Sequence, residues 1–549
     1  MGLSKIPRWT KKQHRQECLC QVALLCAIPL SAFQTATGSI EGRVVNAATG
    51  DAVRRVNLTL GSNQEPHDPA TAQTDDKGGF SFQQLTPGTY RLSGEKAGFE
   101  RQAYGARLNP NVGPLLAVKP GEAVKDVIFK LVPNAVIGGR VMDQDGEAMP
   151  NLVVSVLRST YVRGKREWMP AGSGTTNDRG EFRIASLRPG KYIVSATDMN
   201  IGIGLAGVTK GALPEKPELA YGTTYYPSTG DLSRAAPIEV KMGEDRRGAD
   251  IQMAKTTTVR VRGKVVGAPD GQVLVVMLLK KGAPGSGMAP GGVGIVQPND
   301  ATFEIKSVSP GSYLLMARSA TEVTRPLGAP LLLEVGDQHI DDLSFPLSPG
   351  GGELSGKVTI PGFQPAGEKK VTVTLDRIDF QTGDSPNAKV AVDGAFTLKN
   401  VYPGKYSVRV TGLPDDAFVK AVQAGGAEVD IDGADLSGGP ASLDIQVSRS
   451  AAQVKGSMVG QDEKPVPGAT VVLIPESGRP SLYRSTTGEV DGAFSLRGVA
   501  PGKYRVLAWE DIEPGAFMDP DFVKPYLAKA QDLVLPENGN VKVIVKVVQ

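Results

Sequence analysis

The chain has 549 residues, of which 40% are hydrophobic, 6% aromatic and 22% charged. Its formal net charge is only +3, so no strong basic excess favours nucleic acid as a partner. The 66 glycines and 40 prolines recur too often for any segment after the N-terminus to read as a membrane span.

Residues 1–32 are predicted to be a secretory signal peptide. Five basic residues precede a mostly apolar run at 18–30, and Ser31-Ala32 offers a small-residue cleavage site. The run of 13 residues is shorter than the roughly 20 that a membrane-spanning helix needs. Removal of this segment leaves 56 basic and 57 acidic residues, so the positive excess belongs to the signal.

The three cysteines, Cys18, Cys20 and Cys26, all lie inside the predicted signal. The exported chain would therefore have no disulfide, and its domains would depend on core burial for stability. A lipid anchor at Cys26 is disfavoured because Leu25, which precedes it, is not a small residue. We expect an extracytoplasmic protein, either periplasmic, on the cell surface or secreted.

An eleven-residue pattern returns five times, at 80–90, 182–192, 303–313, 396–406 and 494–504. It reads Phe, any, apolar, two residues, Leu or Val, any, Pro-Gly, any, Tyr. The phenylalanines lie 102, 121, 93 and 98 residues apart, which is the size of one small domain per copy.

Each copy is predicted to form two strands joined at the Pro-Gly pair. In the first copy Phe80 and Phe82 alternate with polar residues, which places both on one face of a strand. The following Pro87-Gly88 suits a type II turn, with glycine at positive φ. A glycine two residues before the first Phe indicates a tight turn in four copies. The third copy has Ala301 there, so we expect its turn to differ.

Further strands flank each copy. A Gly-x-apolar strand opens every domain, as at Gly42-Arg43-Val44, and an alternating strand closes the last one, with Val541, Val543, Val545 and Val547 on one face. The predicted fold class is therefore all-β, a tandem array of five antiparallel Greek-key β-sandwich domains of prealbumin-like or Ig-like type. The predicted limits are 38–134, 135–257, 258–350, 351–450 and 451–549.

The joints between these domains are short, and the plainest linkers are Lys255-Thr256-Thr257-Thr258 and the stretch 348–352. Short joints predict a semi-rigid rod. Three insertions interrupt the pattern. They are 198–234 in the second domain, a glycine-rich and mobile stretch at 282–294, and a short helix at 519–530.

The fifth domain carries a family resemblance. It contains Pro465-Val466-Pro467-Gly468-Ala469-Thr470-Val471, then Asp491-Gly492-Ala493-Phe494, then Pro501-Gly502-Lys503-Tyr504. This string resembles the carboxypeptidase regulatory-like domain. The resemblance implies a prealbumin-like (transthyretin-like) sandwich, related in fold to carbohydrate-binding modules. It extends over essentially all of the chain after residue 38 and is weakest in the third domain.

Residues for catalysis are scarce. Outside the signal only His67 and His339 remain, neither has metalloprotease spacing, and no Gly-x-Ser-x-Gly motif occurs. We therefore predict no enzyme, no catalytic residue, no metal site and no cofactor. A pair of carboxylates brought together between domains is the one catalytic alternative left open.

Two further motifs have ordinary interpretations. The stretch 202–207 spells a dinucleotide-binding pattern, but Gly211 and Pro214 follow where a helix is needed, so a flexible loop is favoured. The segment Asp430-Ile431-Asp432-Gly433-Ala434-Asp435 offers oxygens for calcium or forms an Asp-Gly turn.

Sugar binding needs aromatic side chains with a free face. The candidates are Trp168, Tyr221, Tyr225, Tyr226 and Trp509, with ordinary packing as the alternative for each. We expect an exported, non-enzymatic binding protein of the cell envelope, with a glycan or an envelope protein as partner. A structural spacer or interaction scaffold, and an accessory module for a separate enzyme, are the alternatives.

Overall fold

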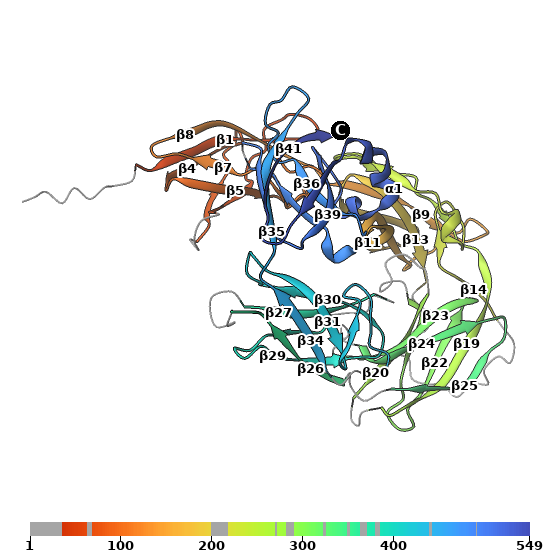
Figure 1. Ribbon diagram of the computed structural model, residues 1–549. Helices are drawn as coiled ribbons and strands as arrows, with labels where there is room; N and C mark the ends of the chain where they lie inside the picture. Colours follow the sequence, from red (N-terminus) through yellow and green to blue (C-terminus); the bar gives the residue numbers. More distant parts are fainter. Residues whose placement is uncertain are drawn as a thin grey trace, which may run out of the picture.

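The computed structural model describes residues 36–62, 68–198, 218–268, 272–280, 290–321, 326–347, 352–362, 370–378, 385–438, 442–489 and 491–548. The predicted signal, His67 and the 202–207 motif lie outside the described residues. Among the described residues nearly all regular structure is β-strand (Figure 1). No helix in this part of the chain is both long and apolar enough to cross a membrane.

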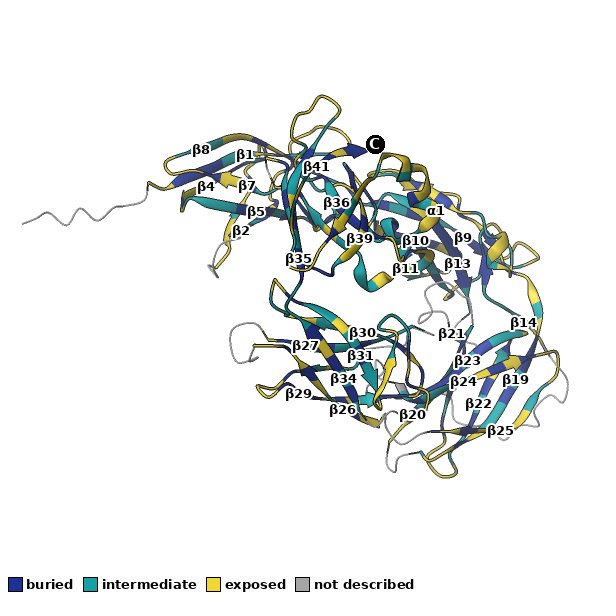
Figure 2. Cartoon of the chain, viewed as in Figure 1, coloured by how far each residue is buried: buried dark blue, intermediate teal, exposed yellow. Residues whose placement is uncertain are grey.

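Five large hydrophobic cores follow one another along the chain, and we call each core with its strands a unit. Their buried residues run from Ile40 to Leu131, Ala135 to Met253, Val259 to Leu347, Leu354 to Val447 and Ala452 to Val547. Buried residues lie on the strands that face each other, and exposed ones lie on the outer faces and turns (Figure 2). This confirms a multi-domain β-sandwich protein.

The first unit has two sheets, β4-β1-β8 and β3-β2-β5-β6 with β7 beside β5. Its strands are β1(Gly38–Asn46), β2(Asn57–Ser62), β3(Ala70–Gln73), β4(Gly79–Leu85), β5(Gly88–Glu95), β6(Gln102–Ala103), β7(Leu116–Val118) and β8(Ala123–Leu131). The second unit has sheets β12-β9-β17 and β11-β10-β13-β15. Its elements are β9(Ala135–Met142), β10(Val153–Val162), β11(Lys165–Thr175), β12(Glu181–Leu187), β13(Gly190–Thr197), β14(Glu218–Tyr221), β15(Thr224–Tyr225), the 3-10 turn η1(Leu232–Arg234), β16(Ile238–Val240), β17(Asp245–Arg246) and β18(Ile251–Gln252).

The third unit contains β19(Lys255–Val266), β20(Leu274–Lys280), β21(Pro290–Ile295), β22(Thr302–Val308), β23(Gly311–Ser319), β24(Pro326–Val335) and β25(Ile340–Pro346). The fourth contains β26(Gly352–Thr359), β27(Thr372–Arg377), β28(Asn387–Lys389), β29(Ala395–Val401), β30(Lys405–Thr411), β31(Phe418–Ala424), β32(Ala427–Val429), β33(Ala434–Asp435) and β34(Leu443–Ser448).

The fifth unit contains β35(Ala452–Val459), β36(Thr470–Pro475), η2(Pro480–Leu482), β37(Arg484–Thr487), β38(Ala493–Val499), β39(Gly502–Trp509), η3(Ala516–Met518), α1(Pro520–Val523), η4(Lys524–Lys529), β40(Gln531–Leu535) and β41(Asn540–Val548). The short helix predicted at 519–530 is confirmed as α1 followed by η4. The alternation in β41 is also confirmed, with Val545 and Val547 buried and Lys542 and Lys546 exposed.

The sheets are mixed rather than wholly antiparallel. Most neighbouring strands are antiparallel, but in each unit the opening strand also pairs in parallel with a strand near the unit's end, as β1 does with β8 and β35 with β41. The opening Gly-x-apolar glycine lies at this parallel pair. A Cβ on Gly42 would lie 2.1 Å from the Val127 carbonyl oxygen, and one on Gly456 would lie 1.8 Å from that of Val543. The glycine is therefore needed because the neighbouring backbone occupies the space of a side chain.

The repeated pattern forms the same corner in every unit. All five first phenylalanines and all five tyrosines are buried. Each tyrosine hydroxyl donates to the carbonyl oxygen four residues earlier, over 2.6 to 2.8 Å, from Tyr90 to Thr86 in the first unit and from Tyr504 to Ala500 in the last. This bond satisfies the one polar atom that the buried ring carries into the core.

The turn at the Pro-Gly pair is not the predicted type II turn. Its glycine has φ between 149° and 155° in four units, whereas type II requires about 80°. A left-handed residue instead precedes the Leu or Val of the pattern, as at Gln84 with φ 57° and Asn400 with φ 61°. The pairing with the opening strand shifts register here in each unit, so the corner is built on a β-bulge.

The turn at Ala301 differs from the others, as predicted, because it is one residue longer: Ala301 N donates to the Gln297 carbonyl oxygen four residues earlier, whereas Gly78 N donates to that of Asp75, three residues earlier. The left-handed backbone conformation is nevertheless kept. Ala301 has φ 58°, close to the left-handed values of Gly78, Gly180, Gly394 and Gly492 in the other units. Its carbonyl accepts from Val265 N over 2.8 Å, as that of Gly78 does from Val44 N. The backbone is held by this shared hydrogen bond, and the alanine accepts the strain of a left-handed conformation.

We therefore expect Ala301→Gly to stabilise the third unit by about 1 kcal/mol, because glycine removes that strain. Urea unfolding of the two chains measures the difference. Gly78→Ala in the first unit is the reverse experiment and should destabilise, since its Cβ would also lie 2.6 Å from the Val44 carbonyl oxygen. An unchanged or lower stability of Ala301→Gly would contradict the interpretation.

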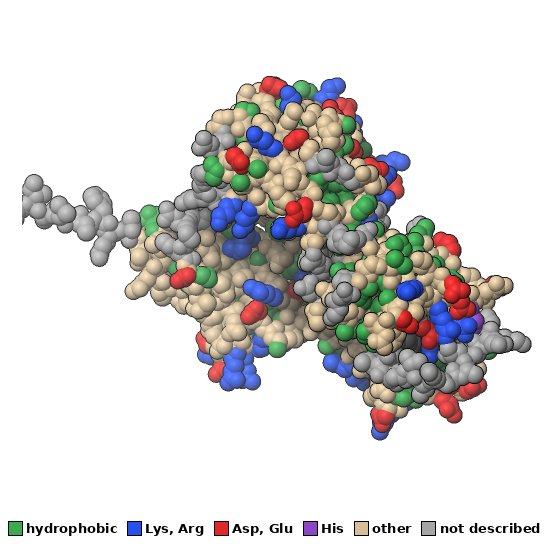
Figure 3. All heavy atoms as spheres, turned by 90° about the horizontal axis from the view of Figure 1, so that it is seen from below, with side chains coloured by type: hydrophobic (Ala, Val, Ile, Leu, Met, Phe, Trp, Pro, Cys, Tyr) green, Lys and Arg blue, Asp and Glu red, His purple; other side chains and the backbone are tan. Residues whose placement is uncertain are grey.

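The units do not form the predicted rod. The chain turns back so that the fifth unit lies beside the first and second, while the third and fourth complete an arc (Figure 1). Seen from below, the surface is hollowed near its middle, with Lys and Arg side chains at the rim (Figure 3). The predicted linker 255–258 is the start of β19, so the predicted limit between the second and third domains falls within a strand. Most of the other predicted linker, 348–351, lies outside the described residues.

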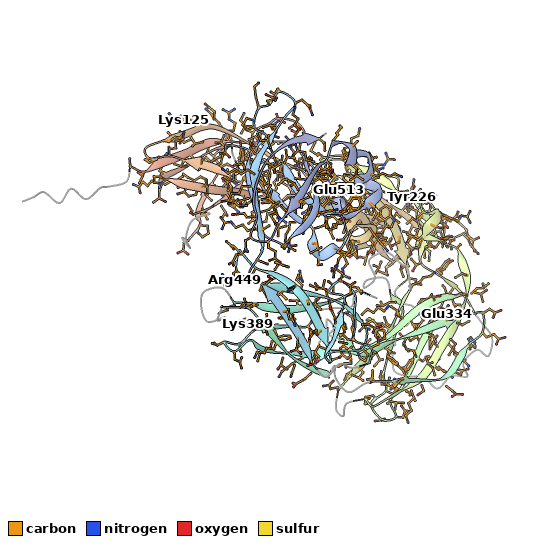
Figure 4. The ribbon with its side chains drawn as sticks, in the orientation of Figure 1. Lys125, Tyr226, Glu334, Lys389, Arg449 and Glu513 are labelled. Carbon is orange, nitrogen blue, oxygen red and sulfur yellow. The ribbon has the colours of Figure 1, made fainter. Side chains whose placement is uncertain are left out.

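Contacts of the fifth unit hold this arrangement. Arg107 of the first unit pairs with Glu510 at 2.7 Å, and Leu108 N donates to Asp511 over 3.1 Å. In the second unit, Arg166 lies 3.5 Å from Glu513. The label of Glu513 in Figure 4 marks this region.

The second unit also meets the fifth through close packing. The Tyr161 and Phe522 rings lie 6.1 Å apart, in an edge-to-face arrangement. Gly164, at the tip of the β10–β11 hairpin, lies against the fifth unit so closely that a Cβ would be 2.4 Å from the Met518 carbonyl oxygen. The helical insertion at 519–530 therefore covers part of the fifth unit and also contacts the second.

Candidate binding pocket between the second and third units

Tyr225 and Trp168 pack together in the second unit. Tyr225 in β15 is 7% exposed and forms a small cluster with Leu157 and Ile193, against which the half-buried Trp168 packs. Ordinary packing therefore accounts for most of the surface of both rings.

Tyr221 and Tyr226 lie on either side of Tyr225 in the chain, and both are partly buried against the second core. The Lys255 ammonium lies 5.4 Å from the centre of the Tyr221 ring. Four of the five predicted ligand residues are thus in one unit, and Tyr225 lines the pocket described below.

Trp509 lies apart from the other four. It is 2% exposed and sits in a separate cluster of the fifth unit, with Phe522 at 6.3 Å and Tyr526 at 5.6 Å between ring centres. A tryptophan that binds sugar needs one free face of its indole ring, and here the rings of Phe522 and Tyr526 pack against that indole. In this conformation Trp509 therefore holds the helical insertion on the sandwich.

The pocket forms because the 198–234 insertion reaches the third unit. Strand β14 from this insertion pairs antiparallel with the first residues of β19, with Glu218 opposite Thr258 and Tyr221 opposite Lys255. Gly222 then lies against the third unit, where a Cβ would be 3.1 Å from Ser309 Oγ. The added strand fixes the two units side by side and encloses a space between them.

This pocket has a volume of about 510 Å³ and is lined mostly by small residues, among them serines, threonines and glycines. Seven hydroxyl side chains line it besides those of tyrosine: Thr197, Thr223, Thr224, Thr256, Ser228, Ser307 and Ser309. Its charged lining residues are Lys255, Lys280 and Asp198. Such a lining suits a ligand that both donates and accepts many hydrogen bonds.

Two tyrosines of the pocket remain protonated at neutral pH. Burial raises the pKa of Tyr313 to about 12, and burial followed by the charge of Asp231 raises the pKa of Tyr225. The Tyr313 hydroxyl donates a hydrogen bond to the Ser309 carbonyl oxygen over 2.7 Å. The ring of Tyr313 also supports the pocket wall, since a Cβ on Gly291 would lie 2.1 Å from its Cε1.

Two of the three aspartates at 430–435 contact the fifth unit, and Asp435 instead accepts from Ser437 N. Asp430 pairs with Arg479 at 3.0 Å, and Asp432 accepts from Ser481 N and Ser481 Oγ over 2.9 and 2.8 Å. Gly433 N donates to the Asp430 carbonyl oxygen, which is the turn considered as the alternative to calcium. No group of three or more His, Cys, Asp or Glu side chains in the described part of the chain is arranged to hold a metal ion.

Sequence reasoning identified the 198–234 insertion but missed the residues that the third unit contributes. Lys280 ends β20, and Ser307 and Ser309 belong to the repeated corner. Their equivalents elsewhere are ordinary turn and strand residues, so no local signal marks them. Only the pairing of β14 with β19 brings them to the insertion.

Comparisons with solved structures find multi-domain surface proteins at low similarity. The minor pilin GBS52 of Streptococcus agalactiae is 14% identical over 40% of this chain and 97% of that chain, with a TM-score of 0.23. Two B repeat units of the collagen-binding protein of Staphylococcus aureus are 12% identical over 75% of this chain and 100% of that one, with a TM-score of 0.13.

The TIE protein of Bacillus anthracis is 14% identical over 57% of this chain, with a TM-score of 0.17. The match spans about half the length of that protein, 51%. No function follows from values this low.

No curated protein matches the chain. The family model for the carboxypeptidase regulatory-like domain matches residues 39–119, which lie in the first unit. The resemblance found in the sequence is therefore confirmed for a domain of this family at 39–119.

Proposed function

We propose that this chain is an exported, non-enzymatic binding protein of the cell envelope, and that it binds a glycan in the pocket between the second and third units. The observation that carries the proposal is that seven hydroxyl side chains line one pocket together with Tyr225 and Tyr313. A sugar offers alternating hydroxyl donors and acceptors that such a lining matches. Export is supported by the N-terminal sequence pattern.

The pocket suits a sugar better than an apolar ligand. Hydroxyl groups both donate and accept, so they can replace the water shell of a sugar without leaving buried polar atoms unpaired. Some of these groups are already oriented by the protein. Thr197 Oγ1 and Thr223 Oγ1 lie 3.1 Å apart, and Thr224 Oγ1 donates to the Gly222 carbonyl oxygen over 3.1 Å.

The test is a glycan microarray probed with residues 33–549, followed by calorimetry on the glycans that bind. Thr256→Val removes a hydroxyl from the pocket and keeps the shape and strand preference of the side chain, so we expect about tenfold weaker binding. Thr374→Val in β27 is the matched control and should bind as the unchanged protein does. A silent array, or equal loss in both variants, would argue against this site.

A second candidate function is a scaffold that holds envelope proteins at fixed positions. The observation that favours it is the fifth unit, which contacts the first, second and fourth units through ion pairs and aromatic packing. Arg497 of the fifth unit pairs with Asp415 of the fourth at 2.6 Å. Contacts on three sides fix the mutual orientation of the units, which is what a scaffold requires.

The contact between the fourth and fifth units yields a pH prediction. Burial, the largest effect, raises the pKa of Asp432 above its ordinary value despite the Ser481 hydrogen bonds. A carboxyl whose folded pKa is raised binds its proton more tightly in the folded state, so its ionised form opposes folding at higher pH.

We expect Asp432→Asn to be at least as stable as the unchanged chain at pH 7 to 8, because asparagine can keep the bond from Ser481 N without a charge. The advantage should shrink as the pH falls through the raised pKa of Asp432, where the carboxyl becomes neutral. Urea unfolding at a series of pH values measures it. A variant that is clearly less stable at pH 8 than at pH 4, relative to the unchanged chain, would refute the assignment.

A further inference from the structure

Two lysines in the pocket have no acidic partner among the described residues. Neither Lys255 nor Lys280 forms an ion pair within 4.0 Å of a carboxylate in the described part of the chain. Lys280 is partly buried and runs along the corner of the third unit, with its Nζ 3.9 Å from the position of a Cβ on Gly311. The Lys280 ammonium therefore makes no direct ion pair in the described part of the chain, which leaves it available to an anionic ligand.

The acids near these lysines do not neutralise the pocket. Asp198 is the one acidic lining residue against two lysines, so the described lining has a net charge of +1. Asp231 lies close enough to Lys280 for its pKa to be affected, but its Oδ1 accepts from Ser233 N and Ser233 Oγ, each over 2.9 Å. Those hydrogen bonds keep the Asp231 carboxylate ionised at the η1 turn, so its charge acts on Lys280 from outside the pocket lining without forming an ion pair.

We propose that the ligand of this pocket is an acidic saccharide, in which a carboxylate on the sugar ring meets Lys280 while the ring hydroxyls meet the threonines and serines. This inference rests on the proposed function and specifies its ligand class. A charged hydrogen bond from an ammonium to a carboxylate is about twice as strong as a neutral one, so the lysine would distinguish acidic from neutral sugars.

Lys255, the first residue of β19, supplies the second positive charge of the pocket lining. Its ammonium lies over the Tyr221 ring, which holds it near the pocket without neutralising it. The hydroxyl lining distinguishes this pocket from a simple anion site, because a bound acetate or phosphate would leave most of the lining hydroxyl groups without a hydrogen-bond partner.

The experiment compares a uronic-acid trisaccharide, the neutral trisaccharide of the same linkage, and sodium acetate, each titrated calorimetrically into residues 33–549. We expect the acidic sugar to bind at least tenfold more tightly than the neutral one, and acetate not to bind measurably. Lys280→Gln should remove the preference for the acidic sugar, and Lys255→Gln should reduce it. Lys125→Gln, which removes an exposed charge on β8 far from the pocket (Figure 4), should change nothing.

Each outcome separates the two proposals. Equal binding of both trisaccharides, with loss in Thr256→Val, would overturn the acidic ligand and leave glycan binding standing. Binding of neither trisaccharide, together with a silent array, would overturn both. Acetate binding as tight as the acidic sugar would show an anion site without sugar recognition. Melting curves of Lys280→Gln and Lys255→Gln establish that each variant is folded, and an acidic preference retained in both would refute the role of the lysines.

Discussion

Replacing Gly456 by alanine should destabilise the fifth unit by about 3 kcal/mol, the upper end of the usual cost of overpacking. The new Cβ would lie 1.8 Å from the Val543 carbonyl oxygen and 3.0 Å from Phe494 Cε1. Neither neighbour can move freely, because Val543 belongs to the parallel pair of β35 with β41 and Phe494 belongs to the core. The strands must separate locally, and the core of the unit opens with them.

The fluorescence of Trp509 measures this prediction in a Trp168→Phe background, because Trp509 is buried in the fifth unit. Urea unfolding should show an earlier transition for Gly456→Ala. Gly61→Ala is the control for a strand glycine with nothing within 4 Å of its Cβ position, and circular dichroism should show a change of less than about 1 kcal/mol in the stability of the first unit. Similar losses in both variants would mean that strand glycines as such, and not the close backbone, set the cost.

Reversing two charges should release the fifth unit from the first and second. In Arg107→Glu/Arg166→Glu, two ion pairs become like-charge contacts with Glu510 and Glu513, which repel each other across the interface. Arg166 also donates to Tyr161 Oη over 3.1 Å, so its loss weakens the aromatic contact with Phe522. We expect a larger radius of gyration in small-angle X-ray scattering, with each unit still folded by circular dichroism.

Two further variants test the cause. Adding Glu510→Arg and Glu513→Arg restores opposite charges and should bring the radius of gyration back towards its original value. Arg54→Glu reverses an exposed charge that pairs with Asp76 of its own unit, and should leave the scattering unchanged. If the doubly reversed chain scatters like the original, the ion pairs do not hold the arrangement.

The repeated pattern predicted the fold class because its residues act locally. Alternation at Phe80 and Phe82 determines which face is buried, and the corner tyrosine follows two residues after the Pro-Gly pair. The predicted type II turn was wrong because the residue with left-handed backbone conformation is Gln84, and glutamine is not a residue type that indicates such a conformation. The domain limits remain a proposal. The limit between residues 257 and 258 agrees least with the strands, because it divides β19.

The arrangement of the units could not be predicted, since it depends on residues far apart in the chain. Glu510 and Glu513 read as solvent-exposed charges beside a short helix, and nothing near them indicates Arg107 or Arg166. The same holds for the candidate pocket, where Thr223 and Ser309 meet only after β14 joins the third unit. The assignment of ligand roles to Tyr225 and Trp509 stays a prediction, although burial limits what either ring can contact.

The return of the fifth unit to the first has a mechanical consequence. A force that pulls the two ends of the chain apart acts first across the contact of Arg107 and Leu108 with Glu510 and Asp511, because this is the shortest path between the terminal units. While that contact holds, the third and fourth units carry little tension. Once this contact and those of the second and fourth units with the fifth have broken, the arc can lengthen before any sandwich unravels, so the closed chain would behave as an extensible tether.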